Sequence, residues 1–339
     1  MKTAQRACAV LSLEVNCYEQ LSAEFLLHVG LEGLFPVGGH VSGFTDLGKI
    51  QCGVDRTRRY RVGRVREVLG GADGLDLAAV AVAKELVHNV KFLNITCAPE
   101  GKLAVESADD PNALTLLIPR ANDKGFAMTG SYSCMTLLST LIFDTASDEQ
   151  KAEWVETIAK MGEEVISREP EIADYLAGDF NRVTYLGSGS FGGLAQESQL
   201  KILELAHGLV ATSYDTSMGY RHGPKSFVDD KTLVFVFVNN DAYTRQYDID
   251  ILNEIGGDEI AQHTVAVQQE GATVYEGESF TFKGYEALPE GYLALPFVMF
   301  AQAISLLNSV RVGNTPDTPS PTGTVNRVVK GVTIHPFTA

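Results

Sequence analysis

The chain has 339 residues, 45% of them hydrophobic, and its 43 acidic residues against 27 basic ones give a formal net charge of −16. This length allows two domains, each with a hydrophobic core of its own. A surface this acidic repels nucleic acid and anionic membranes unless positive charge is concentrated locally, so we expect the chain to bind neither.

The five cysteines are widely scattered and form no CxxC pair, which predicts neither a disulfide framework nor a zinc site. No apolar run has the length that predicts a membrane span. Residues 1–15 contain a short apolar stretch, but Glu14 interrupts it and no convincing cleavage site follows. We therefore expect a cytoplasmic protein.

Residues 1–76 show no clean alternation of strands and helices, and six arginines lie within residues 56–66. Two interpretations of this run are open: a basic patch for nucleic acid, or a solvated and irregular segment. The negative charge of the whole chain favours the second interpretation, and we rank nucleic-acid binding last among the candidate functions.

From residue 77 onward the sequence predicts helices and strands in alternation. Apolar residues at helical spacing indicate the helices, and short β-rich runs between turn residues indicate the strands. The first cycle has a helix at 77–87, strands at 91–97 and 113–118, and a helix at 130–143, followed by a polar helical stretch towards a boundary near 175–180.

A second cycle begins at residue 182, with strands at 182–186, 211–215, 232–238 and 263–269 and helices at 193–210, 244–255 and 296–312. The strand at 232–238 is apolar throughout, as expected when helices cover both of its faces. Strands alternating with helices predict an α/β fold with parallel sheets, here in two consecutive units. The remaining stretch, 313–331, is rich in Pro, Thr and Gly and is interpreted as an extended arm.

A glycine-rich turn joins the strand at 182–186 to the next helix. Gly187, Gly189 and Gly192 fit the spacing G-x-G-x-x-G, and the following strand ends in an acid, Asp215. This outline is typical of a dinucleotide site, but backbone N–H groups at a helix start also suit a sugar phosphate. The hydroxyls of Ser188 and Ser190 favour a hydroxyl-rich ligand, and a merely tight turn remains open as a third interpretation.

The helix after this turn places Glu197, Lys201 and Glu204 on one face, at positions i, i+4 and i+7. Such a row is usually a solvent-exposed ladder of ion pairs. Because leucines occupy most of the other sides of this helix, the row could instead be partly enclosed. A carboxylate there would gain a raised pKa and serve as a general base.

His222 lies in a turn between Arg221 and the rigid pair Gly223-Pro224. A lone histidine in a turn is more often structural than catalytic. However, this turn and the glycine-rich turn both follow the carboxyl ends of parallel strands, where such sheets bind ligands. We therefore expect His222 and the start of the Glu204 helix to face one pocket.

Four long stretches of this sequence resemble one known family. They are YLGSGSFGGLAQESQLKILEL, YDTSMGYRHGPKSFVDDKTLVFVFV, YTRQYDIDIL and the tail GNTPDTPSPTGTVNRVVKGVTIHP. The chain is identified through them as a member of the tagatose-6-phosphate ketose/aldose isomerase family, also described as galactosamine-6-phosphate deaminase/isomerases. The resemblance begins near residue 77 and implies two sugar isomerase (SIS) domains, each a flavodoxin-like αβα sandwich with a parallel sheet.

On this basis we divide the chain into five parts. They are an atypical N-terminal part of the first SIS domain (1–76), the remainder of that domain (77–160), a linker helix (161–180), the second SIS domain (181–312) and a C-terminal arm (313–339). The family resemblance implies conversion of galactosamine 6-phosphate to tagatose 6-phosphate with release of ammonia. It implies neither a metal nor an organic cofactor, and it favours a sugar isomerase turn over a nucleotide site.

A more distant resemblance, to the isomerase half of glucosamine-6-phosphate synthase, suggests roles for three residues. His222 would open the sugar ring, Glu204 would shuttle a proton between C2 and C1, and Lys330 in the tail would stabilise the developing oxyanion. SIS sites are often completed by a second subunit, so we expect a homodimer or larger homo-oligomer. The predicted contacts to the sugar phosphate are Ser188, Ser190, Glu197, Lys201, Phe126, Met128, Thr129 and Arg221.

The first domain departs from the family pattern at its phosphate loop. The expected G-x-G-T-S turn and serine-rich loop are absent, and residues 70–76 read GGADGLD, which places Asp73 where a hydroxyl residue is expected. An aspartate facing a phosphate is electrostatically unfavourable. We therefore consider a shifted reading frame up to about residue 75, testable in the gene sequence, and an alternative function as a catalytically impaired sugar-phosphate-binding protein.

Overall fold

The computed structural model describes residues 75–271, 273–328 and 333–335. The arginine-rich run, the missing phosphate loop and the reading-frame hypothesis therefore lie outside the described residues, apart from the backbone of residues 75 and 76. The predicted α/β class with parallel sheets is confirmed, because every strand pair that the described residues form is parallel.

The larger sheet has five strands in the order β4-β3-β5-β6-β7. These strands are β3 (Arg182–Gly187), β4 (Ala211–Asp215), β5 (Thr232–Phe237), β6 (His263–Gln269) and β7 (Ser279–Phe282). Four of them were predicted within a residue or two of their bounds. The fifth, β7, was missed because its four residues SFTF are too short to establish a period.

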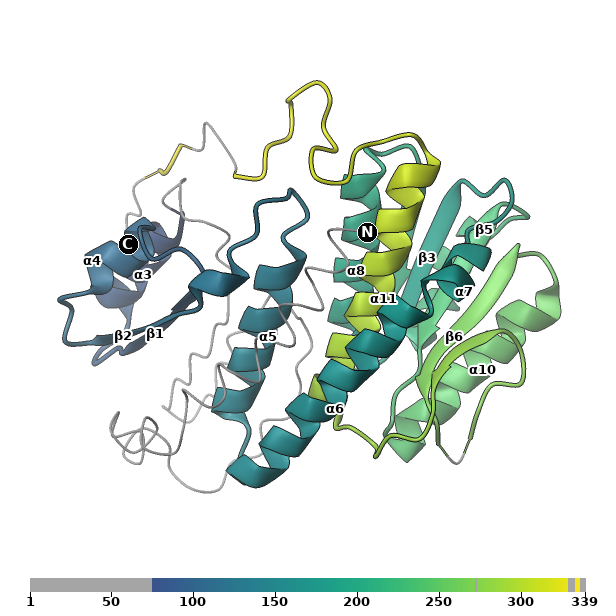
Figure 1. Ribbon diagram of the computed structural model, residues 1–339, viewed down its shortest axis with the longest axis horizontal. Helices are drawn as coiled ribbons and strands as arrows, with labels where there is room; N and C mark the ends of the chain where they lie inside the picture. Colours follow the sequence, from purple (N-terminus) through teal and green to yellow (C-terminus); the bar gives the residue numbers. More distant parts are fainter. Residues whose placement is uncertain (1–74, 272, 329–332, 336–339) are drawn as a thin grey trace.

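Helices cover both faces of this sheet (Figure 1). They are α8 (Phe191–Leu205) and α11 (Glu290–Arg311) on one face and α10 (Ala242–Asp258) on the other. The side chains of β5 alternate between the two cores: Phe235 and Phe237 pack with α8 and α11, whereas Val234 and Val236 pack with α10. All six residues of β5 are buried, which confirms the prediction of a strand covered on both faces.

Helix α11 begins at Glu290, six residues before the predicted start at Pro296, which lies inside the helix. Proline is tolerated best in the first turn of a helix, and here it lies in the second turn of α11. The long apolar surface of α11 packs against α8 in the core, and the helix is mostly buried. By length and composition alone it would pass for a membrane span; its burial identifies it as a core helix.

The first unit shows a parallel pair of strands, β1 (Phe92–Thr96) and β2 (Ala113–Leu117), within the described residues. The helices of this unit are α3 (Leu75–Leu86), α4 (Lys102–Ser107) and α5 (Thr129–Phe143). In Figure 1, α5 lies between this pair of strands and the layer formed by α8 and α11. Because α5 contacts α11, this helix lies against the second unit.

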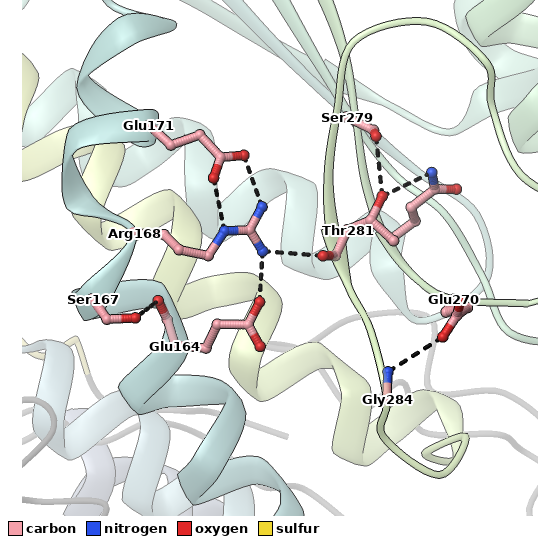
Figure 2. A network of polar contacts seen from close by, with 9 residues as sticks. Glu164, Ser167, Arg168, Glu171, Glu270, Ser279, Thr281 and Gly284 are labelled. Atoms are coloured by element: carbon pink, nitrogen blue, oxygen red, sulfur yellow. Dashed lines mark hydrogen bonds and ion pairs between the residues drawn. The ribbon is translucent and has the colours of Figure 1, made fainter.

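Two helices link the units, α6 (Asp148–Ser167) and α7 (Glu169–Asp174), and Arg168 lies between them. Its guanidinium forms ion pairs with Glu164 Oε1 at 2.6 Å and Glu171 Oε1 at 2.7 Å, and donates to the carbonyl of Thr281 on β7 at 3.0 Å (Figure 2). It also lies 3.6 Å from the centroid of the Phe280 ring. Arg168 thus joins the linking helices to the edge strand.

Replacing Arg168 by alanine is expected to lower the free energy of unfolding by about 3 kcal/mol, because charge-assisted hydrogen bonds and a cation–π contact are lost together. Replacing Arg168 by lysine should retain little of this stability, since an ammonium group lacks the planar guanidinium that donates to Glu164, Glu171 and Thr281 simultaneously. Denaturant unfolding measures the change. The exposed Lys160–Glu156 pair on α6 supplies the control: Lys160→Ala should cost about 0–1 kcal/mol. Equal losses for Arg168→Ala and Lys160→Ala would contradict this account.

Candidate functional site

The predicted row on α8 forms a buried cluster of charges. Lys201 Nζ lies 2.8 Å from Glu204 Oε2 and 3.4 Å from Glu197 Oε1. The side chain of Lys201 is 7% exposed, against 12% for Glu197 and 26% for Glu204. The row is therefore partly enclosed rather than a solvated ladder, and Glu204 is the carboxylate more open to a ligand.

The two carboxylates of this cluster differ in environment. Burial, which disfavours the charged form, raises the pKa of Glu197. The nearby positive charge of Lys201 opposes this shift and the negative charge of Glu204 adds to it. Glu197 is thus the deeper group, which neutralises more readily, and one ammonium group holds both carboxylates in place.

The segment before α5 contacts this cluster through its backbone. Lys201 Nζ donates to the carbonyl of Ala127 at 3.1 Å. Met128, the N-cap of α5, adopts a left-handed conformation with φ of 51°, and Asp123 caps the helix by accepting from the backbone N–H groups of Gly130 at 3.2 Å and Ser131 at 2.7 Å. The predicted contacts Phe126, Met128 and Thr129 therefore adjoin the residue that contacts the α8 cluster.

The glycine-rich turn is tightly packed by residues of the protein itself. A side chain on Gly187 would lie 2.5 Å from the carbonyl oxygen of Phe191, and Gly189 has φ of +62°. The N–H of Ser190 donates to Glu290 Oε1 at 2.5 Å. A carboxylate thus already occupies the start of α8, where the pyrophosphate of a dinucleotide would bind. Because a second anion there would be repelled, this contact argues against the dinucleotide interpretation.

The two serines of this turn have different environments. The Ser188 hydroxyl donates to Asp248 Oδ1 at 2.6 Å, so it is engaged inside the fold. The Ser190 hydroxyl is buried and has no hydrogen-bond partner among the residues that the structure describes. Ser190 keeps a free donor, whereas Ser188 would have to leave Asp248 to bind a sugar. Both contacts to the substrate stay predictions.

The His222 turn follows β4 and the short helix α9 (Ser217–Tyr220). Gly223 has φ of +126°, a conformation that favours glycine, and Pro224 begins a short 3-10 helix. The His222 side chain is exposed. Its neighbour Arg221 forms an ion pair with Glu254 of α10 at 2.8 Å, so Arg221 is engaged with α10 rather than with the α8 cluster.

His222 and Glu204 lie near opposite edges of the sheet within one chain. The His222 turn and the start of α8 both lie at the carboxyl edge, as the sequence predicts. However, α8 runs back towards the amino edge, and Glu204 lies in its last turn. Thirteen residues of helix at 1.5 Å each correspond to about 20 Å. His222 therefore lies at the same edge of the sheet as the start of this helix and away from Glu204.

The C-terminal arm passes from the end of α8 to the segment before α5 (Figure 1). Asn314 Nδ2 donates to the carbonyl of Leu205 at 2.8 Å, and Arg327 donates to Asn122 Oδ1 at 3.0 Å. A side chain on Gly125 would lie 2.7 Å from Asp317 Oδ1, so the arm also packs closely at this point. Lys330 itself lies outside the described residues, and its role stays a prediction.

Metal ligands do not cluster in the described part of the chain: residues 75–271, 273–328 and 333–335 hold no group of three or more His, Cys, Asp or Glu that could bind a metal ion.

Comparison with known proteins decides the family. The chain is 39% identical over 267 residues to D-galactosamine-6-phosphate deaminase AgaS of Escherichia coli, an alignment that covers 78% of this chain and 69% of that protein. It therefore belongs to the AgaS family. A second member, from a Shewanella species, is 37% identical over 263 residues and is covered to 64% of its length. No family model matches the chain.

The AgaS family assignment agrees with the solved structures. The crystal structure of tagatose-6-phosphate ketose/aldose isomerase from Escherichia coli superimposes with a TM-score of 0.71 at 35% sequence identity, over 80% of this chain and 70% of that one. The resemblance that the sequence motifs predicted is thereby confirmed. The five-stranded parallel sheet with helices on both faces is the flavodoxin-like sandwich expected for a sugar isomerase domain.

Proposed function

We propose that the chain is a sugar-phosphate isomerase and deaminase that converts galactosamine 6-phosphate and water to tagatose 6-phosphate and ammonia. The observation behind this proposal is the enclosed cluster on α8, which contacts the segment before α5 in a chain of the AgaS family. A carboxylate that is partly shielded from water and held by an ammonium group is suited to moving a proton at carbon.

In the proposed reaction, His222 moves a proton between the ring oxygen and O1, which opens the pyranose. Glu204 removes the proton from C2 and returns it to C1, while the amine loses one N–H proton and O1 gains one, so that the aldehyde becomes a CH₂OH group and the amine becomes an imine at C2. Water then adds to this imine, and ammonia leaves as the ketone forms. Lys330 stabilises the oxyanion that develops on O1 when C2 loses its proton.

A second copy of the chain is part of this proposal. Because His222 lies at the carboxyl edge of the sheet and Glu204 at the far end of α8, one chain does not bring both groups to one sugar. An exposed His222 on a rigid turn is suited to enter the site of a neighbouring subunit. The active protein is then a homodimer or a larger oligomer.

The test is ammonia release by the purified full-length chain incubated with galactosamine 6-phosphate, with tagatose 6-phosphate measured in the same samples. Galactosamine, which lacks the phosphate, and the N-acetylated sugar phosphate, which lacks a free amine, are the control substrates. Equal amounts of ammonia and ketose are expected from the phosphorylated amine alone. Saturable binding of galactosamine 6-phosphate without either product would refute the enzymatic function and favour a sugar-phosphate-binding protein.

A further inference from the structure

One motif of the sequence, YTRQYDIDIL, has no part in the proposed reaction, although it places a carboxylate deep inside the fold. Asp248 of this motif lies on α10 and is fully buried. Its Oδ1 accepts from the hydroxyls of Ser188 at 2.6 Å and Ser217 at 2.5 Å, and its Oδ2 accepts from the N–H of Asn239 at 2.9 Å. Each donor belongs to a different loop.

These three loops follow β3, β4 and β5, so a single carboxylate joins three strand ends at the carboxyl edge. Ser188 belongs to the glycine-rich turn that begins α8. Ser217 is the first residue of α9, the helix that ends directly before Arg221 and His222. His222 is therefore connected to the start of α8 through α9, whose Ser217 shares the Asp248 carboxylate with Ser188.

Arg245, one turn earlier on α10, extends the same connection. It is 4% exposed and donates to the backbone carbonyls of Asn239 at 3.0 Å and Gln269 at 3.0 Å, which places the end of β6 in the network. Burial raises the pKa of Asp248, whereas the hydrogen bonds from both serines and from Asn239, and the charge of Arg245, lower it. An apolar side chain would avoid the cost of burying a charge but could not fix these donors in place.

We propose that Asp248 is a positioning residue that fixes the His222 turn relative to the start of α8. It contacts no reacting atom and acts through Ser217 and Ser188. This inference rests on the proposed function, because it assigns Asp248 to the ring-opening step that His222 performs there. A displacement of about 1 Å at an acid–base group lowers the rate by up to about 100-fold.

The experiment compares Ser217→Ala, Ser188→Ala and Asp248→Asn in the full-length chain. The control is Asp250→Asn, which makes the same change on the exposed side of α10. Hydrogen–deuterium exchange is measured in peptides that cover 187–192 and 216–223, together with kcat and KM for galactosamine 6-phosphate. Each serine variant keeps two of the three hydrogen bonds to Asp248, so the test survives if Asp248→Asn fails to fold.

Ser217→Ala should speed exchange at 216–223 alone and lower kcat about 10-fold at unchanged KM. Ser188→Ala should speed exchange at 187–192 alone, Asp248→Asn at both segments, and Asp250→Asn at neither. Unchanged exchange in the serine variants, or faster exchange at 216–223 with unchanged kcat, would overturn the positioning role. If the wild-type chain releases no ammonia, the proposed function fails, and the exchange pattern still decides whether Asp248 couples the two turns.

Discussion

Replacing Glu204 by glutamine is expected to lower kcat by about 10³-fold with little change in KM, because the amide keeps the shape of the carboxylate but cannot accept the C2 proton. The 2.8 Å contact with Lys201 changes from an ion pair to a hydrogen bond with the amide oxygen, so the fold should persist. The measurement is ammonia release at saturating substrate. Deuterium incorporation at C1 of the product in heavy water reports proton transfer at carbon separately from imine hydrolysis.

The matched control for this variant is Glu156→Gln. Glu156 lies on α6, pairs with Lys160 and is 64% exposed, so the same loss of charge should leave kcat unchanged. A Glu204→Gln chain that retains wild-type kcat and deuterium incorporation would show that another group moves the proton. Glu197, the other carboxylate bound to Lys201, would then be the next candidate.

The local pattern of the sequence predicts the α8 cluster well, because its members are neighbours on one helix. Glu197, Lys201 and Glu204 share a face by helical geometry alone, whatever surrounds that helix. How deeply this face is buried could not be predicted, since it depends on the segment before α5, where the backbone carbonyl of Ala127 accepts from Lys201. A main-chain acceptor has no residue-type signature, so only the structure reveals this contact.

The partners of the glycine-rich turn are distant in sequence, which explains why they were missed. Ser188 and Asp248 are 60 residues apart, and Ser190 and Glu290 are 100 residues apart. A G-x-G-x-x-G spacing predicts a tight turn and an open helix start, but it contains no information on which side chain folds back over that start. The residue types in the turn predict a ligand contact at Ser188. In the structure, the Ser188 hydroxyl instead donates to Asp248.

The sequence predicts that His222 and the start of the Glu204 helix face one pocket; the structure places the His222 turn and the start of α8 at the same edge of the sheet, and a shared pocket stays a prediction. Strand order and direction predict which loops share the carboxyl edge of a sheet. Glu204 lies about 20 Å further along the helix, beyond that edge. The proposed reaction uses both groups on one sugar, so under that proposal a second subunit would supply one of them.

Mixing two inactive variants tests this arrangement. His222→Asn should lower kcat by about 10²- to 10³-fold, since an amide cannot carry the ring-opening proton. When Glu204→Gln and His222→Asn chains are unfolded, mixed in equal amounts and refolded together, about a quarter of the wild-type activity should return, because half the dimers are mixed and each has one intact site.

The intact site in such a dimer combines Glu204 of the His222→Asn chain with His222 of the Glu204→Gln chain. The control mixture pairs Glu204→Gln with the double variant Glu204→Gln/His222→Asn, in which no site contains Glu204, and it should stay inactive. If His222 serves the site of its own chain, the first mixture also stays inactive, because each site then lacks one of the two groups. Activity in the first mixture alone is therefore the signature of a site shared between two subunits.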